Sequence, residues 1–220
     1  LVGSEMCIRD RSPAAAGLFQ RALSQSGSLF NNWAYNRNPL SSAQMLTRNL
    51  QLQVTGNADL LNQLRQVSVE RLLAAADIII GREELIFEEL NFMPSMDPPN
   101  TNEMRIFTAP PSLMARLGAI NQVPYMIGFN SAESLNRITH YLDDPTIMER
   151  FNQNPNLLIP SEWSSIRGTQ QGNEVIASFR ALYFDGATTL TREHAWQWVN
   201  YVSDREFIFG VSKQARLHTA

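Results

Sequence analysis

The feature that most constrains the fold is the apolar run at residues 123–129 together with the residues that follow it. The run is typical of a β-strand, ends in Gly128-Phe129-Asn130 and is followed by a single carboxylate, Glu133. In an α/β sheet, ligands and catalytic groups collect beyond the carboxyl ends of the strands. A Ser-His-Asp/Glu hydrolase needs a carboxylate that orients its histidine and stabilises the imidazolium. The run therefore predicts a strand that delivers Glu133 to the ligand-binding edge of a sheet.

A simpler role for Glu133 is also open at this point. A glutamate between a strand and a helix can complement the positive end of the helix macrodipole. Residue types and spacing alone favour this helix-charge role over a catalytic one.

Helical patterns dominate the rest of the chain, and only residues 22–25 and 123–129 are clearly strand-like. Helix-start signals are Ser12-Pro13, Ser41 or Ser42, Ser68, Asp144-Pro145 and Asp204. The expected helices cover residues 12–22, 41–52, 57–67, 68–80, 110–117, a stretch from about 131, a stretch from 145, 173–184, 190–202 and 204–218. A complete α/β domain should alternate strands with helices. The pattern therefore favours a helix-rich piece of a larger α/β sheet protein.

Composition excludes several classes of function. A net charge of -3 gives no electrostatic basis for binding nucleic acid or an anionic membrane surface. No apolar run approaches the roughly 18 residues of a membrane span. Cys7 is the only cysteine, so the chain can form neither an internal disulfide nor a cysteine-based metal site. We expect no metal and no cofactor, and we interpret the acidic group as a solvated face: Glu83, Glu84, Glu88 and Glu89.

Four segments resemble, in the same order, the carboxylesterase type-B (carboxylesterase/cholinesterase) family. They are Ser12-Pro13 with residues 17–22 and Gln25-Ser26-Gly27-Ser28; residues 58–73; Phe92-Met93-Pro94 with Asp97, Pro111 and Gly118; and residues 124–133. The likeness continues weakly through residues 204–216. The resemblance implies a fold of the α/β class, namely part of an α/β-hydrolase fold. Residues 12–220 would then form an incomplete carboxylesterase type-B domain.

The resemblance assigns roles to two residues. Glu133 matches the acid of the family's catalytic triad, and Ser26 matches a buried serine near the triad that can hydrogen-bond the histidine. As a plainer alternative, Ser26 is a turn residue. Ser134 stands where the family usually has glycine. A serine is tolerated there if the backbone of residue 134 is helical rather than at positive φ.

The other two triad members are not found in the chain. No Gly-x-Ser-x-Gly motif occurs in it. Family spacing puts the nucleophile roughly 26 residues before Ser26 and the histidine roughly 110 residues after Glu133, at or beyond the two ends. The histidines present are therefore expected to be structural: His140, His194 and His218. Residues 1–11 do not match the family and are expected to be a foreign segment.

The resulting hypothesis is a serine carboxylic-ester hydrolase that forms an acyl-enzyme on small-molecule esters. This chain would contribute the triad acid and would be inactive alone. The resemblance also implies an extracellular location. The alternative is a non-catalytic cholinesterase-like adhesion or receptor ectodomain, which could keep Glu133. A small helical binding module would not explain the ordered motifs. Three of the four tryptophans are expected in the core rather than in a pocket: Trp33, Trp196 and Trp198.

Overall fold

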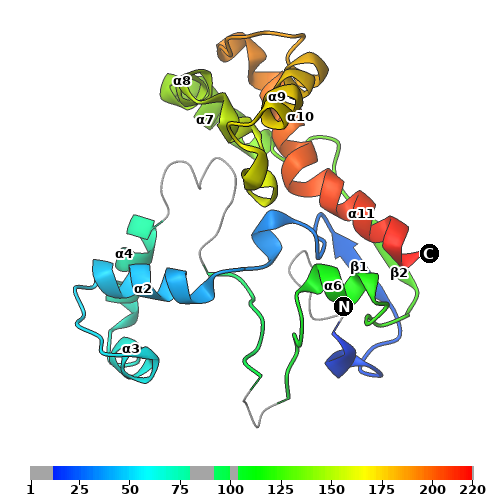
Figure 1. Cartoon of the computed structure of the whole chain (residues 1–220). Coiled ribbons are helices and arrows are strands. Elements are labelled where there is room, and N and C mark those ends of the chain that lie inside the picture. Colours follow the sequence, from blue (N-terminus) through cyan, green and yellow to red (C-terminus); the bar gives the residue numbers. More distant parts are fainter. Residues whose placement is uncertain (1–11, 80–91, 100–103, 220) are drawn as a thin grey trace.

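The computed structural model describes residues 12–79, 92–99 and 104–219, and its centre is a two-stranded parallel sheet (Figure 1). Strand β1 (Ala22–Gln25) pairs with β2 (Tyr125–Gly128) in the register Ala22↔Tyr125 to Gln25↔Gly128. Both strands expected from the sequence are confirmed. The acidic group at residues 83–89 and the expected foreign segment at residues 1–11 lie outside the described residues.

Helices make up most of the described chain. The α-helices are α2 (Pro39–Asn49), α3 (Asn57–Leu64), α4 (Val69–Ile79), α6 (Pro111–Arg116), α7 (Ile138–Asp143), α8 (Pro145–Gln153), α9 (Gln170–Tyr183), α10 (Ala195–Ser203) and α11 (Phe209–His218). Short 3₁₀ turns are η1 (Pro13–Ala15), η2 (Asn32–Ala34), η3 (Leu135–Arg137), η4 (Pro155–Leu158), η5 (Ser161–Ile166) and η6 (Arg192–His194). A π-helical turn, η7 (Asp204–Ile208), joins α10 to α11.

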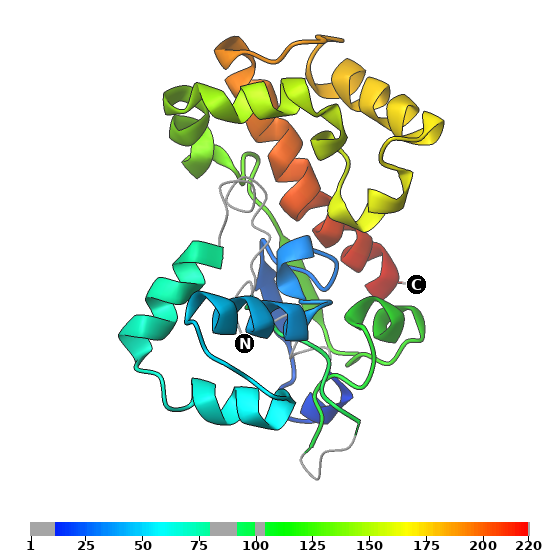
Figure 2. The same cartoon turned by 60° about the vertical axis from the view of Figure 1, so that its left-hand side comes forward.

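The elements gather into three groups (Figures 1 and 2). Helices α7 to α10 form one group above the sheet in Figure 1, and α2 to α4 form a second group to its left. The third group consists of the sheet, α6 and α11, and α11 contacts β2. Because α11 continues from α10 through η7, it connects the α7–α10 group to the sheet.

The largest core lies in the α7–α10 group around Trp198, which is fully buried. Its ring lies edge-on to Phe151, with centroids 4.4 Å apart, and edge-on to Tyr141 at 5.6 Å. Such pairs add to the free energy gained by burying aromatic surface. Trp33 is also buried, as predicted, but Trp196 is 56% exposed, and its core assignment is wrong. Residues two apart on a helix point to nearly opposite sides, so Trp196 faces away from Trp198.

The structure corrects the first predicted helix. Ser12 caps it as expected, since its Oγ accepts the Ala14 amide at 3.2 Å. The helical turn nevertheless ends at Ala15 rather than near residue 22. Ala16 is extended, with ψ 132°, and Gly17 adopts φ +78°. A left-handed glycine ends a helix efficiently, so the chain turns here before it enters β1.

Two other helix starts differ from the prediction. Helix α2 begins at Pro39 after Asn38, and neither Ser41 nor Ser42 caps it. Asp204 is not a cap either, because its φ of -64° and ψ of -46° are helical and the chain runs on into α11. Proline is favourable at the first position of a helix, which explains the earlier start of α2.

Other predicted boundaries are confirmed. The Ser68 hydroxyl accepts the Arg71 amide at 3.4 Å ahead of α4, and Asp144 Oδ1 accepts the Thr146 amide at 3.0 Å at the start of α8. Gly118 follows α6 with φ +67°.

Candidate active site

Glu133 lies in a turn directly after β2, and its carboxylate folds back onto the end of the strand. Its Oε1 accepts the backbone amide of Asn130 at 2.6 Å. The Asn130 side-chain amide lies 3.4 Å from each carboxylate oxygen. A charge-assisted bond to backbone fixes the first oxygen firmly. The partly exposed carboxylate is therefore held at the carboxyl edge of the sheet, and the helical stretch expected from about residue 131 begins as this turn.

The residue after Glu133 is anchored to the neighbouring helix. The Ser134 amide donates to Ser203 Oγ at 3.0 Å, and that hydroxyl donates to the Val199 carbonyl at 2.7 Å. Both serines are buried. Ser134 has φ -93°, so no glycine is required at this position. The acid turn is therefore fixed at one end by β2 and at the other by α10.

Ser26 lies at the same edge of the sheet as the acid turn. Its backbone amide donates to the Gly128 carbonyl at 2.8 Å, which extends the pairing one residue past β1. Its φ is +63°, a conformation that non-glycine residues rarely adopt. Strained backbone of this kind often accompanies functional sites. The two residues singled out in the sequence, Ser26 and Glu133, thus follow neighbouring strands at one edge of the sheet.

The three histidines have other surroundings. His140 is exposed on α7. His194 Nδ1 accepts the Thr191 amide at 3.1 Å in a capping box that starts η6. His218 Nε2 lies 3.2 Å from the Val123 carbonyl, at the end of β2 opposite Glu133. Within the described ranges, none of them forms a hydrogen bond with Glu133.

A buried acid that the sequence did not indicate lies in the π-turn η7. Glu206 is fully buried, and its Oε1 lies 3.1 Å from Arg205 Nε. Burial raises the pKa of Glu206 to about 8, against the lowering effect of Arg205. The Glu206 carbonyl accepts the indole N–H of Trp33 at 2.9 Å. This bond joins η7 to the segment that follows β1.

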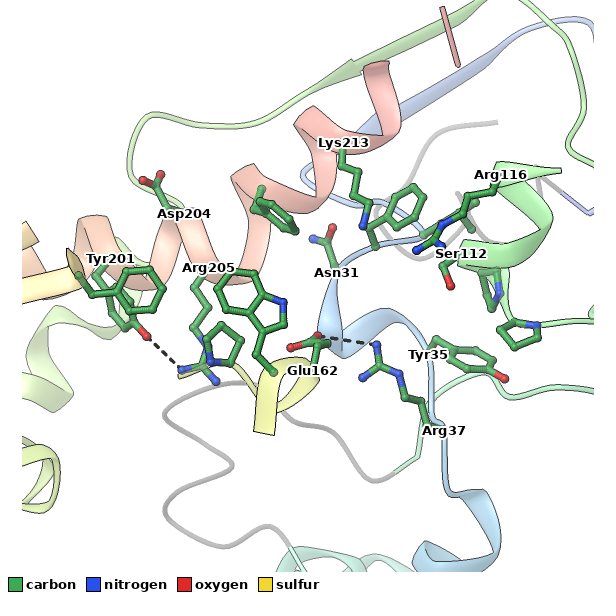
Figure 3. Close-up of a pocket in the computed structure, with 18 of the residues that line it drawn as sticks. Asn31, Tyr35, Arg37, Ser112, Arg116, Glu162, Tyr201, Asp204, Arg205 and Lys213 are labelled. Atoms are coloured by element: carbon green, nitrogen blue, oxygen red, sulfur yellow. Dashed lines mark hydrogen bonds and ion pairs between the residues drawn. The ribbon is translucent and has the colours of Figure 1, made fainter. Parts of the chain in front are cut away.

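A pocket of about 350 Å³ opens beside η7 (Figure 3). Its walls come from the segment after β1, the start of α6, η5, α9 and the α10–α11 helix. The sequence could not reveal it, because these segments are far apart along the chain. Neither Glu133 nor Ser26 lines this pocket.

The part of the chain that the structure describes offers neither a metal-binding cluster nor a membrane-spanning helix. No group of three or more His, Cys, Asp or Glu side chains there could hold a metal ion. Of the helices in the described ranges, none is long and apolar enough to cross a membrane.

Comparison with known proteins gives a consistent picture. The model of the carboxylesterase family matches residues 5–220. The juvenile hormone esterase of Tribolium castaneum is 22% identical over 210 residues, 91% of this chain and 35% of the relative. The para-nitrobenzyl esterase of Bacillus subtilis is 37% identical over 118 residues, 53% of this chain and 21% of the relative. The chain thus spans about a third or less of these two proteins.

A solved structure shows the same fold. It is the juvenile hormone esterase of Manduca sexta with OTFP covalently attached, with a TM-score of 0.76 and 19% identity. The match covers 98% of this chain and 39% of that one. It confirms the partial α/β-hydrolase fold expected from the sequence.

Proposed function

Because the chain belongs to the carboxylesterase family, we propose that it is the acid-bearing part of a serine carboxylic-ester hydrolase that acts on small-molecule esters. One observation carries the proposal. The carboxylate of Glu133 is held by the Asn130 amide at the carboxyl edge of the β1–β2 sheet, the edge at which Ser26 adopts a positive φ. Active sites of α/β sheets lie at this edge.

The geometry suits a carboxylate that orients a histidine. Oε1 of Glu133 is used by the Asn130 backbone, at 2.6 Å. Oε2 has only a long contact of 3.4 Å with the Asn130 side chain, so it is available to an imidazole N–H. In the proposed reaction the histidine takes the proton of the nucleophilic serine, which attacks the ester carbonyl and expels the alcohol. Glu133 stays ionised and stabilises the imidazolium that forms.

The nucleophilic serine and the histidine of this reaction would come from outside these 220 residues. The chain contains no Gly-x-Ser-x-Gly, and its histidines lie elsewhere. We therefore expect the 220-residue chain alone to be inactive. An extracellular location for the complete protein is part of the same proposal.

Covalent labelling of the complete protein tests this function. The complete protein is incubated with diisopropyl fluorophosphate and analysed by intact mass, and p-nitrophenyl acetate hydrolysis is measured before and after. We expect one adduct per molecule and loss of turnover. Heat-denatured protein and the 220-residue chain, as controls, should take no label. A folded complete protein that neither labels nor hydrolyses esters would contradict the proposal and would support the adhesion or receptor ectodomain instead.

A further inference from the structure

We propose that the pocket beside η7 binds a small amphipathic carboxylate, with an aliphatic or aromatic body and an anionic head. This inference concerns a site other than the Glu133 turn and does not depend on ester hydrolysis. The pocket volume, about 350 Å³, lies in the range of small-molecule sites.

One end of the pocket is aromatic and suits an apolar body. Trp163 from η5 and Phe179 from α9 stack with centroids 6.5 Å apart and an interplanar angle of 15°. Tyr183 and Tyr201 continue this wall. Trp163 remains 42% exposed, so a ligand that covers it would remove apolar surface from water.

The other end gathers positive charge. Arg116 from α6 and Lys213 from α11 extend toward one another across the pocket, with Ser112 beside Arg116 (Figure 3). Lys213 Nζ lies over the rings of Phe30 and Phe209, at 4.7 and 5.6 Å from their centroids. No carboxylate among the described residues forms an ion pair with Arg116 or Lys213. Two facing cations repel one another, and an anion bound between them would remove that repulsion.

The acidic groups of the pocket are engaged elsewhere. Glu162 lies 3.9 Å from Arg37, and Asp204 accepts the Tyr183 hydroxyl at 2.7 Å. Both lie away from the Arg116–Lys213 end in Figure 3. The other two cations that line the pocket, Arg37 and Arg205, each lie beside a glutamate: Glu162 at 3.9 Å and Glu206 at 3.1 Å. Positive charge without an ion pair among the described residues is therefore at Arg116 and Lys213, which favours a carboxylate head there with the body toward Trp163.

The floor between the two ends is preorganised. Asn31 is 4% exposed, and its Oδ1 accepts the Ser28 hydroxyl while its Nδ2 lies 3.5 Å from the Ser26 carbonyl. A fixed polar floor lowers the entropy cost of ordering a ligand.

Calorimetric titration of the complete protein tests the proposal, with octanoate as the probe and 1-octanol as its neutral analogue. Because hydrogen bonds to charged groups are stronger than those between neutral groups, we expect octanoate to bind at least about tenfold more tightly than 1-octanol. The double variant R116Q/K213Q should lose at least about tenfold in octanoate affinity. Arg216→Gln removes a positive charge from the exposed end of α11 outside the pocket lining, and it should leave the affinity unchanged.

Equal affinity for the two probes, unchanged octanoate binding in R116Q/K213Q, or no binding to the wild type would each overturn the proposal. If the double variant does not fold by circular dichroism, the single variants Arg116→Gln and Lys213→Gln decide, and each should weaken octanoate binding. Ester hydrolysis is assayed separately from octanoate binding. The two measurements therefore distinguish an esterase that lacks the octanoate site from a protein that binds octanoate but does not hydrolyse esters.

Discussion

The backbone amide of Ser134 donates a buried hydrogen bond of 3.0 Å to the hydroxyl of Ser203, 69 residues away in the chain. This bond joins the turn that carries Glu133 to the α7–α10 group. The Ser203 hydroxyl is itself oriented by the Val199 carbonyl at 2.7 Å. The position of the candidate acid therefore depends on α10 as well as on β2.

Removing the Ser203 hydroxyl should destabilise the protein and loosen the acid turn. In Ser203→Ala the Ser134 amide would be buried without a partner, which costs about 1–3 kcal/mol of unfolding free energy. Urea denaturation of the complete protein measures this cost, and the turnover of an ester substrate should fall with it. Ser178→Ala is the matched control.

Ser178 makes the same type of bond to the carbonyl four residues earlier, at 2.8 Å, but on the exposed face of α9. Its replacement should change the unfolding free energy by about 0.5 kcal/mol or less. Equal effects of the two substitutions would contradict an anchoring role for Ser203.

The close approach of α11 to the turn after β1 predicts a second sensitive position. A methyl group added at Gly210 would clash with Asn31 Oδ1 and lie 2.7 Å from Ser28 Oγ. Gly210→Ala should therefore lower the unfolding free energy by about 1–3 kcal/mol, the usual cost of overpacking. Thermal or urea unfolding checks this. Gly128→Ala on the exposed side of β2, where nothing lies within 4 Å, should cost about 0.5 kcal/mol or less.

Burial of Glu206 predicts a specific pH dependence of stability. Its pKa rises from an ordinary 4.5 to about 8 on folding, chiefly because burial disfavours the charged form. The folded state thus retains a proton that the unfolded state releases near pH 4.5. The stabilisation is complete below about pH 4.5 and is lost as the pH rises through about 8.

Glu206→Gln replaces the protonated acid with a neutral amide and should remove this dependence. From pH 5.5 to 8.5, the wild type should lose on the order of a few kcal/mol more unfolding free energy than the variant does. Urea unfolding at a series of pH values measures the difference. Glu174→Gln, on the exposed face of α9, should keep the wild-type slope. A Glu206→Gln profile parallel to that of the wild type would rule out titration of Glu206 as the cause.

Local signals in the sequence were enough to predict the strands and helices next to the candidate site. Strand β1 was predicted at its observed bounds because a short apolar run meets Ser26-Gly27-Ser28. Helix α8 was predicted because Asp144-Pro145 combines a cap with a favoured first residue. The parallel order of the strands then put Ser26 and Glu133 at one edge.

Contacts between segments that are distant in the chain could not be predicted from local sequence signals. A serine on α10 shows no sign that it will anchor Ser134, and Asp204 resembles a cap although the chain there is helical. The π-turn at residues 204–208 changes which side chains face inward, so an acid at position 206 becomes buried. The pocket depends on several such long-range placements.

The most direct test of the proposed function is the ester turnover of Glu133→Gln in the complete protein. The amide keeps the shape of the side chain but cannot stabilise an imidazolium, so kcat should fall by about 10³–10⁴-fold. Glu149→Gln, an exposed glutamate on α8, is the matched control and should retain turnover within about twofold. If Glu133→Gln retains wild-type turnover while folded, Glu133 is not the triad acid and the central claim is wrong.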